Sequence, residues 1–132
     1  MKKQQTISYS GVGAHHQNGI AEVTIKTITS CARTMMLHAL LHWPETADLE
    51  LWPFAIDYAV HLWNHLPKQD GRLSPKEYIT GTIAPNHNHL LRLHTFMSPC
   101  YVLDPKLQDA GKVPKWNKRA RQGQYLGPSK HH

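Results

Sequence analysis

The chain has 132 residues, of which 40% are hydrophobic, and its four tryptophans and nine prolines are typical of a globular protein and not of a disordered one. No run of about 18 apolar residues occurs, which argues against a membrane-spanning helix. The two cysteines, Cys31 and Cys100, are too few for a disulfide framework or a four-cysteine zinc site, and they predict two reduced thiols of an intracellular protein.

The formal net charge of +6 is concentrated in the C-terminal segment. Residues 106–130 contain seven basic residues and one acidic residue, Asp109, whereas residues 1–105 contain eight of each and are neutral. The seven basic residues are Lys106, Lys112, Lys115, Lys118, Arg119, Arg121 and Lys130. Such a segment indicates a polyanionic partner, usually nucleic acid, and the alternative is a solvated end of the chain.

The first half of the chain has the pattern of helices. Residues 1–17 are expected to form an extended entry or the remnant of a strand, followed by a loop. A helix is predicted over residues 19–42, because apolar residues recur there at steps of four or eight and Asn18 suits its N-cap. A second helix is predicted to begin near Pro53 and to stop at Pro67.

The second half changes from helix to strand. Residues 74–77, Ser-Pro-Lys-Glu, form a capping box that predicts a short helix, which Gly81 ends. Residues 87–94 have no clear period. Residues 96–103 are predicted as a strand, and short segments such as 124–126 complete a small β-module. Helices followed by strands predict the α+β class.

Glu22 is the residue that best suits catalytic chemistry. On an ideal helix Glu22, Lys26, Thr29 and Arg33 fall at i, i+4, i+7 and i+11, which is one stripe. A carboxylate there suits a hard divalent ion bound to phosphate, and Lys26 and Arg33 are spaced to hold a nucleic-acid backbone. The alternative, which the spacing alone favours, is an exposed pair of Glu22 and Lys26.

Residues 16–22, His-Gln-Asn-Gly-Ile-Ala-Glu, resemble the H-Q-N-G-V-A-E segment of copia-type (Ty1/copia) retrotransposon integrases, which are DDE polynucleotidyl transferases of the RNase H-like superfamily. The resemblance spans roughly residues 7–131, and the order and spacing of its motifs together make it specific. The further matching motifs lie at residues 32–36, 51–55, 64–67, 74–77, 89–103 and 119–129.

The resemblance implies that Glu22 is the third metal-binding carboxylate of the catalytic site, a ligand of Mg²⁺ or Mn²⁺. It implies DNA integration as the function, DNA as the partner, and the nucleus as the place where a functional protein acts. Lys26 and Arg33 would contact the DNA backbone. A secondary nucleic-acid surface would comprise Lys115, Lys118, Arg119 and Arg121.

The resemblance also divides the chain. Residues 1–80 would be the C-terminal part of an RNase H-like catalytic domain, residues 81–94 a linker, and residues 95–132 a partial SH3-like β-module, the retroviral polymerase segment. The first aspartate of the sequence is Asp48, so the two that should precede Glu22 fall outside it, and we expect the chain alone to be inactive. Without the central sheet, the apolar stripe over residues 20–40 is expected to be exposed, with self-association or instability as the consequence.

The sequence departs from the family pattern at Val23, at residues 97–98 and at Pro128, as a degenerate copy would. One alternative function is a non-catalytic nucleic-acid-binding module that uses the basic C-terminal segment, and another is an unexpressed fragment without activity. Zinc binding by the histidine pairs is disfavoured, because no cysteine lies near them at the spacing of a zinc ligand. Stacking of Trp116 on a base stays open, because that residue lies in the basic segment.

Overall fold

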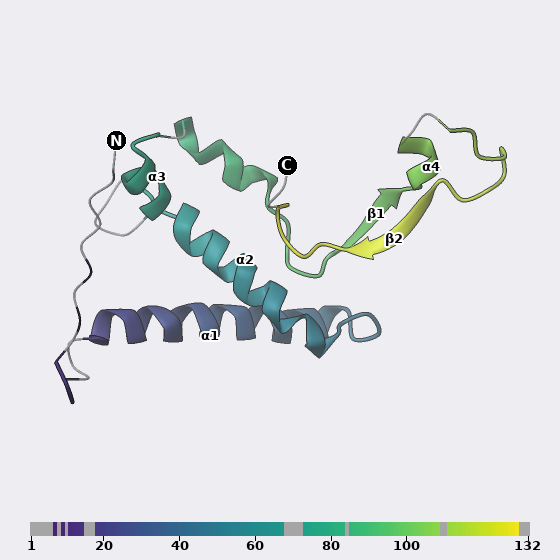
Figure 1. Cartoon of the computed structure of the whole chain (residues 1–132). Helices are drawn as coiled ribbons and strands as arrows, with labels where there is room; N and C mark the ends of the chain where they lie inside the picture. The colour runs from purple at the N-terminus through teal and green to yellow at the C-terminus, as the bar shows by residue number, and fades with distance from the viewer. Residues whose placement is uncertain are drawn as a thin grey trace.

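The structure of the chain, a computed structural model, describes residues 7, 9, 11–14, 18–67, 73–83, 85–108 and 111–129, with the backbone alone for residues 85–87. The extended entry predicted for residues 1–17 lies largely outside them. Within the described residues a group of helices precedes a two-stranded antiparallel sheet, which agrees with the α+β prediction at that level (Figure 1). None of the described helices is long and apolar enough to span a membrane.

The two long helices form a pair. Helix α1 spans Gly19–His42, as predicted, and the Trp43 N–H closes it with a hydrogen bond of 2.8 Å to the Ala39 carbonyl. Asn18 occupies the N-cap position, although its side chain makes no capping hydrogen bond. A short 3₁₀ helix, η2 (Leu49–Leu51), leads into α2 (Trp52–His65), whose first turn contains Pro53.

Helix α3 (Pro75–Thr80) packs against α2, and its start follows the predicted capping box. The Ser74 hydroxyl accepts from the Glu77 N–H at 3.3 Å, and a Glu77 carboxylate oxygen accepts from the Ser74 N–H at 2.7 Å. Both side chains are buried, which makes these bonds important, because a buried polar group without a partner is costly. Gly81 ends the helix in the left-handed conformation at φ 67°.

The predicted strand over residues 96–103 begins later than expected. Strand β1 spans Pro99–Leu103, because Phe96 and Met97 form a buried turn instead. A short helix, α4 (Pro105–Gln108), follows, and β2 (Ala120–Gln124) pairs with β1 in an antiparallel register that sets Tyr101 opposite Gln122. Of the short segment 124–126, predicted as part of the β-module, Gln124 lies in β2 and Tyr125 follows it. A 3₁₀ helix, η3 (Pro85–Arg92), occupies the segment without a clear period.

Backbone hydrogen bonds continue the hairpin into the helical part. The Met97 N–H donates to the Tyr125 carbonyl at 2.7 Å, and the Tyr125 N–H donates to the Ser98 carbonyl at 2.9 Å. Gly127 follows at φ 124°, and a Cβ atom there would lie 3.3 Å from the ring of Tyr58. The chain after β2 thus lies directly on α2.

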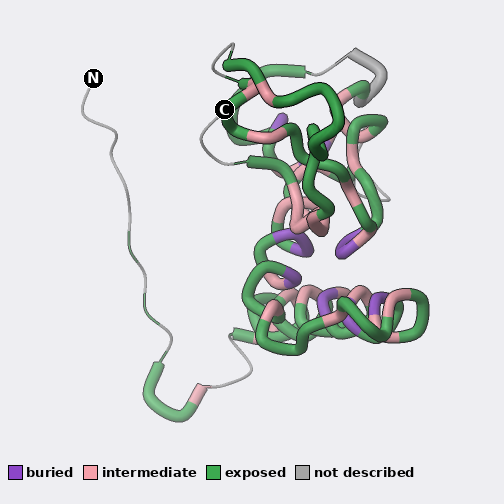
Figure 2. The backbone as a smooth tube through the Cα atoms, turned by 90° about the vertical axis from the view of Figure 1, so that its right-hand side faces the viewer, coloured by how far each residue is buried: buried purple, intermediate pink, exposed green. Residues whose placement is uncertain are grey.

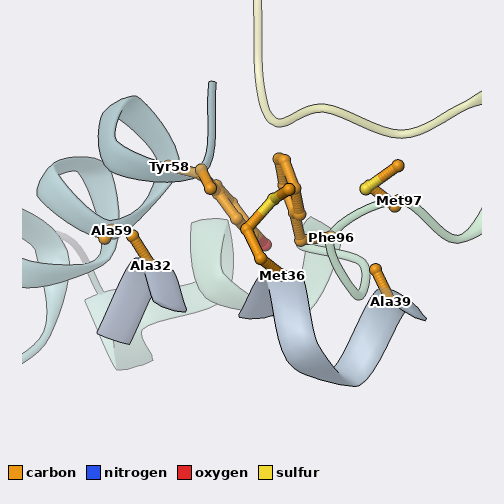
Figure 3. Close-up of a cluster of buried hydrophobic side chains, with 8 residues drawn as sticks. Ala32, Met36, Ala39, Tyr58, Ala59, Phe96 and Met97 are labelled. Carbon is orange, nitrogen blue, oxygen red and sulfur yellow. The ribbon is translucent and has the colours of Figure 1, made fainter. Parts of the chain in front are cut away.

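One buried cluster joins these elements (Figure 3). Alanines on α1 and α2 let the two helices approach closely, and the turn before β1 fills the remaining space with large side chains. The Tyr58 hydroxyl donates to the His94 carbonyl at 2.7 Å and so ties α2 to this turn. The buried members are Ala32, Met36, Ala39, Ala55, Tyr58, Ala59, Phe96 and Met97. The cluster contains residues from before and after the predicted linker, residues 81–94. The division into domains stays a prediction.

The expected exposure of the apolar stripe on α1 was wrong over most of its length. Ala32 and Met36 are buried, and Ile28 and Leu40 are half-buried, because α2 covers this face. Its N-terminal part stays exposed, with Ile20 at 88% and Ile25 at 65%. Figure 2 shows buried segments gathered where α1 meets the rest of the chain. Other apolar side chains of α1, Val23, Leu37 and Leu41, are exposed, and helical spacing puts them on the opposite face.

Candidate nucleic-acid interface

Glu22 lies in the first turn of α1 and is exposed, as are Lys26 and Arg33. The partial positive charge at a helix N-terminus favours a carboxylate in that turn. Helical spacing puts the three side chains on one stripe, at the border of the face that α2 covers. The structure therefore leaves all three predicted residues accessible to a partner.

The described residues do not by themselves form a metal centre. No group of three or more His, Cys, Asp or Glu side chains among them is arranged to hold an ion. A two-metal site that cleaves or joins phosphodiesters needs several oxygen ligands, and Glu22 supplies one carboxylate. The Mg²⁺ or Mn²⁺ implied by the resemblance stays a prediction for a longer protein.

The remaining predicted residues gather on the hairpin formed by residues 99–124, which we call the basic hairpin. Its described acidic residue is Asp104, whose carboxylate accepts from the Lys106 N–H at 2.9 Å and so begins α4. The described cations are all exposed, and Figure 1 shows the connection between β1 and β2 extending away from the helices. The described cations of the hairpin are Lys106, Lys112, Lys115, Lys118, Arg119 and Arg121.

Strand pairing places two of these cations on one face. Arg121 lies opposite Val102 in the register, and the Asp104 N–H donates to the Arg119 carbonyl at 2.9 Å, which extends the ladder by one residue. Residues two apart in a strand point to the same side, so Arg119 and Arg121 share a face. That spacing suits two contacts along a phosphate backbone.

Trp116 lies in the connection between the strands and is 91% exposed. A turn holds it, in which the Asn117 N–H donates to the Pro114 carbonyl at 3.0 Å. The Lys115 ammonium lies 5.7 Å from the centroid of the indole ring, within the range of a cation–π contact. An exposed aromatic ring beside cations is able to stack on an unpaired base.

The structure does not bring the two predicted surfaces together. Glu22 lies in the first turn of α1, and Figure 1 shows the connection between β1 and β2 far from the start of that helix. The stripe of α1 and the basic hairpin are therefore separate surfaces of the chain.

Sequence reasoning missed a group of basic residues around α2. His61 and His65 lie one turn apart on that helix, and Lys76, His89 and Arg92 come to them from α3 and η3. The i, i+4 spacing of the two histidines on a predicted helix was the available signal. The proximity of Lys76, His89 and Arg92 to these histidines could not be predicted from the sequence, because those residues belong to later elements, α3 and η3.

Comparisons of this chain with protein-family models, with curated proteins and with solved structures gave no match. The resemblance to copia-type integrases, and the RNase H-like and SH3-like assignments, therefore stay predictions. Functional inference rests on the motifs of the sequence and on the geometry of the described residues.

Proposed function

We propose that this chain binds DNA through the basic hairpin, as part of a copia-type retrotransposon integrase. The observation that carries the proposal is the gathering of six exposed cations on one hairpin whose described acidic residue is Asp104. Phosphate contacts from lysine and arginine release condensed counterions and supply most of the sequence-independent affinity for DNA. A hairpin with this charge balance suits such contacts.

The integrase part of the proposal rests on Glu22 and its setting. The motif around it resembles the third carboxylate of the DDE site, and its exposed position in the first turn of α1 suits a residue that faces a partner. Lys26 and Arg33 would hold the DNA backbone along the same stripe. The helices would be the C-terminal part of an RNase H-like core, and the hairpin part of an SH3-like module. Such a protein would act in the nucleus.

The hairpin is tested by DNA binding across a salt series. The purified chain and its Lys115/Lys118/Arg119/Arg121→Ala variant are titrated into a labelled duplex, and the logarithm of affinity is plotted against that of salt. The slope should become shallower by about 0.9 for each phosphate that the variant no longer neutralises, or by about 3 to 4 for all four substitutions together. A variant that binds with the affinity and slope of the unmodified chain would refute the proposal.

A matched control removes charge elsewhere. Lys68 and Arg72 are two cations of the sequence outside the hairpin, and their double substitution by alanine should leave the salt slope unchanged. The Lys26/Arg33→Ala variant tests the stripe of α1 separately. It should reduce the slope by about 2 if both residues contact phosphates.

The alternative function, a dedicated nucleic-acid-binding module, predicts the same salt dependence and needs its own test. The genomic reading frame that contains the chain is sequenced upstream of the codon for Met1. An integrase should encode two aspartates of the DDE site there, in frame or past a frameshift. A dedicated binding module should lack them.

A further inference from the structure

A pocket of about 650 Å³ lies where α2, α3 and η3 meet, and the proposed DNA contacts do not use it. Its volume lies within the range of about 300–1,000 Å³ that is usual for small-molecule sites. Its walls carry an unusual number of groups that are or can become cationic: His61, His65, Lys76, His89 and Arg92.

Contacts within the pocket fix the tautomer of His65. The rings of His61 and His65 stack with centroids 3.9 Å apart, and the centroids of His65 and His89 lie 5.2 Å apart. The Lys76 ammonium donates to Nε2 of His65 at 3.0 Å, so the proton of a neutral His65 is on Nδ1, which donates to the His61 carbonyl at 2.7 Å. Lys76 is thereby oriented toward the histidines.

Two carboxylates lie near the basic groups of the pocket. Glu77 lines the same wall, but its carboxylate accepts from the Ser74 N–H at 2.7 Å within the capping box. Asp57 lines a neighbouring cavity together with His61, His65 and Lys76. Burial, and then the charges of His65, Lys76 and His89, lower the pKa of His61 to about 4. The Lys76 ammonium and the neighbouring histidines thus add to the effect of burial in disfavouring a proton on His61.

We propose that this pocket binds a phosphate group, either as inorganic phosphate or as a phosphate monoester. Lys76 and Arg92 would supply the charge-assisted hydrogen bonds, since ammonium and guanidinium groups bind phosphate oxygens strongly. The hydroxyls of Thr80 and Thr82 line the same pocket and offer further donors. The residues differ from those of the basic hairpin, so this site goes beyond the proposed DNA contacts.

A bound dianion reverses the local electrostatics. It favours the protonated form of His61, so it raises the pKa of that ring from about 4 toward its ordinary value. Linkage then requires the anion to bind more tightly as the pH falls toward the pKa of His61 in the complex. Sulfate is the suitable probe for this dependence, because it keeps its charge over the range in which phosphate is itself titrated.

The test is a titration of the full chain with sodium sulfate and with inorganic phosphate, followed by NMR of the histidine ring resonances and by calorimetry. Saturating sulfate should raise the pKa of His61, and the dissociation constant should fall between about pH 7.5 and about pH 5. Lys76→Ala and Arg92→Ala should each weaken binding by about tenfold, the equivalent of one charge-assisted hydrogen bond. Both side chains are exposed, and circular dichroism verifies that the variants fold.

The control variant is Lys115/Lys118/Arg119/Arg121→Ala, which should bind sulfate at His61 as the unmodified chain does. The proposal is overturned if the His61 resonances and pKa do not respond to saturating sulfate, or if only the hairpin variant fails to bind. A nucleoside 5′-monophosphate and inorganic phosphate form the last comparison. Tighter binding of the nucleotide assigns the site to a phosphate monoester, and equal binding assigns it to free phosphate.

Discussion

Tyr58 is the residue of α2 that contacts both the turn before β1 and the segment after β2. Its ring stacks near Phe96, with centroids 6.1 Å apart, and meets Tyr125 edge-on at 5.8 Å. Its hydroxyl donates to the His94 carbonyl. Burial, together with the neighbouring Tyr125, raises the pKa of Tyr58 well above its ordinary range, so the hydroxyl stays protonated and able to donate at neutral pH.

Replacement of Tyr58 by phenylalanine removes this hydrogen bond and keeps the ring. We expect the free energy of unfolding to fall by about 1–2 kcal/mol, because the His94 carbonyl loses its partner in a part-buried place. Urea unfolding followed by circular dichroism measures the change. Tyr101→Phe is the matched control, since Tyr101 is 78% exposed, and it should change stability little. Equal effects of the two substitutions would contradict the role of Tyr58.

His61 makes stability depend on pH. Its pKa is about 4 in the folded chain and near 6.5 when unfolded, so the unfolded chain binds more protons between these values. The contribution of neutral His61 is full above about pH 6.5 and is lost as the pH falls toward 4. Thermal unfolding between pH 7.5 and pH 4.5 should show this loss, and His61→Gln should flatten it. An exposed histidine, His42, provides the control, because His42→Gln should keep the slope of the unmodified chain.

At this scale the sequence indicated the exposed residues better than the buried ones. Glu22, Lys26 and the cations of the hairpin are exposed as a polar pattern predicts, because charged side chains keep their hydration. The proximity of His61 and His89 could not be predicted from the sequence, since it depends on how η3 packs near α2. Whether any of these residues contacts DNA or a metal stays a prediction.

Among the elements, those with local signals were predicted closely. Helix α1 ends before Pro44, α2 carries Pro53 in its first turn, and α3 begins at the capping box and ends at Gly81. Each of these signals acts through a neighbouring backbone N–H or a fixed φ angle. Such chemistry needs no tertiary context, so the sequence alone is sufficient to locate it.

The elements that were missed depend on contacts distant in sequence. Helix η3 has the i, i+3 repeat of a 3₁₀ helix, which a search for the 3.6-residue period does not detect. The apolar residues Phe96 and Met97 resemble the start of a strand, but the core of α1 and α2 draws them into a turn, with Met97 at φ 62°. Tertiary packing thus overrode local propensity there.

The capping box of α3 gives a prediction at this scale. Ser74→Ala removes the hydroxyl that accepts from the Glu77 N–H, in a position that is 1% exposed. The free energy of unfolding should fall by about 1 kcal/mol, and the loss should appear in urea unfolding. Ser30→Ala is the control on the exposed side of α1, where alanine favours the helix, and it should leave stability unchanged or slightly higher. A neutral Ser74→Ala variant would show that the cap is dispensable.

Over the whole molecule, the turn at Phe96 connects the helical pair with the hairpin. Phe96 is 2% exposed. Its neighbour Met97 is fully buried, and the Met97 N–H donates a hydrogen bond to the Tyr125 carbonyl. Phe96→Ala should lower the free energy of unfolding by about 3–5 kcal/mol, because it empties the centre of a small core. Hydrogen exchange of the β1 and β2 amides should accelerate with it, since the hairpin loses its support.

Phe54 supplies the comparison for this substitution. It lies on α2 with 47% of its surface exposed, and Phe54→Ala should cost much less stability and leave the amides of the hairpin protected. If both variants lose the same stability, the turn is not the connection that the packing indicates. If Phe96→Ala unfolds the chain altogether, Phe96→Leu provides a milder change in the same direction.

The same cluster predicts an order in which the parts of the chain fold. Helices α1 and α2 are neighbours in sequence and need close only a short loop, so their pairing is fast. Tyr125 and Leu126 contact Tyr58 from half of the chain away. Closing that long loop has a larger entropic cost than closing the short loop between α1 and α2. We therefore expect the helical pair to form first during synthesis, with Met36 and Tyr58 less covered until the contacts of Phe96 and Tyr125 form. That interval is when a chaperone would have the most apolar surface of this protein to hold.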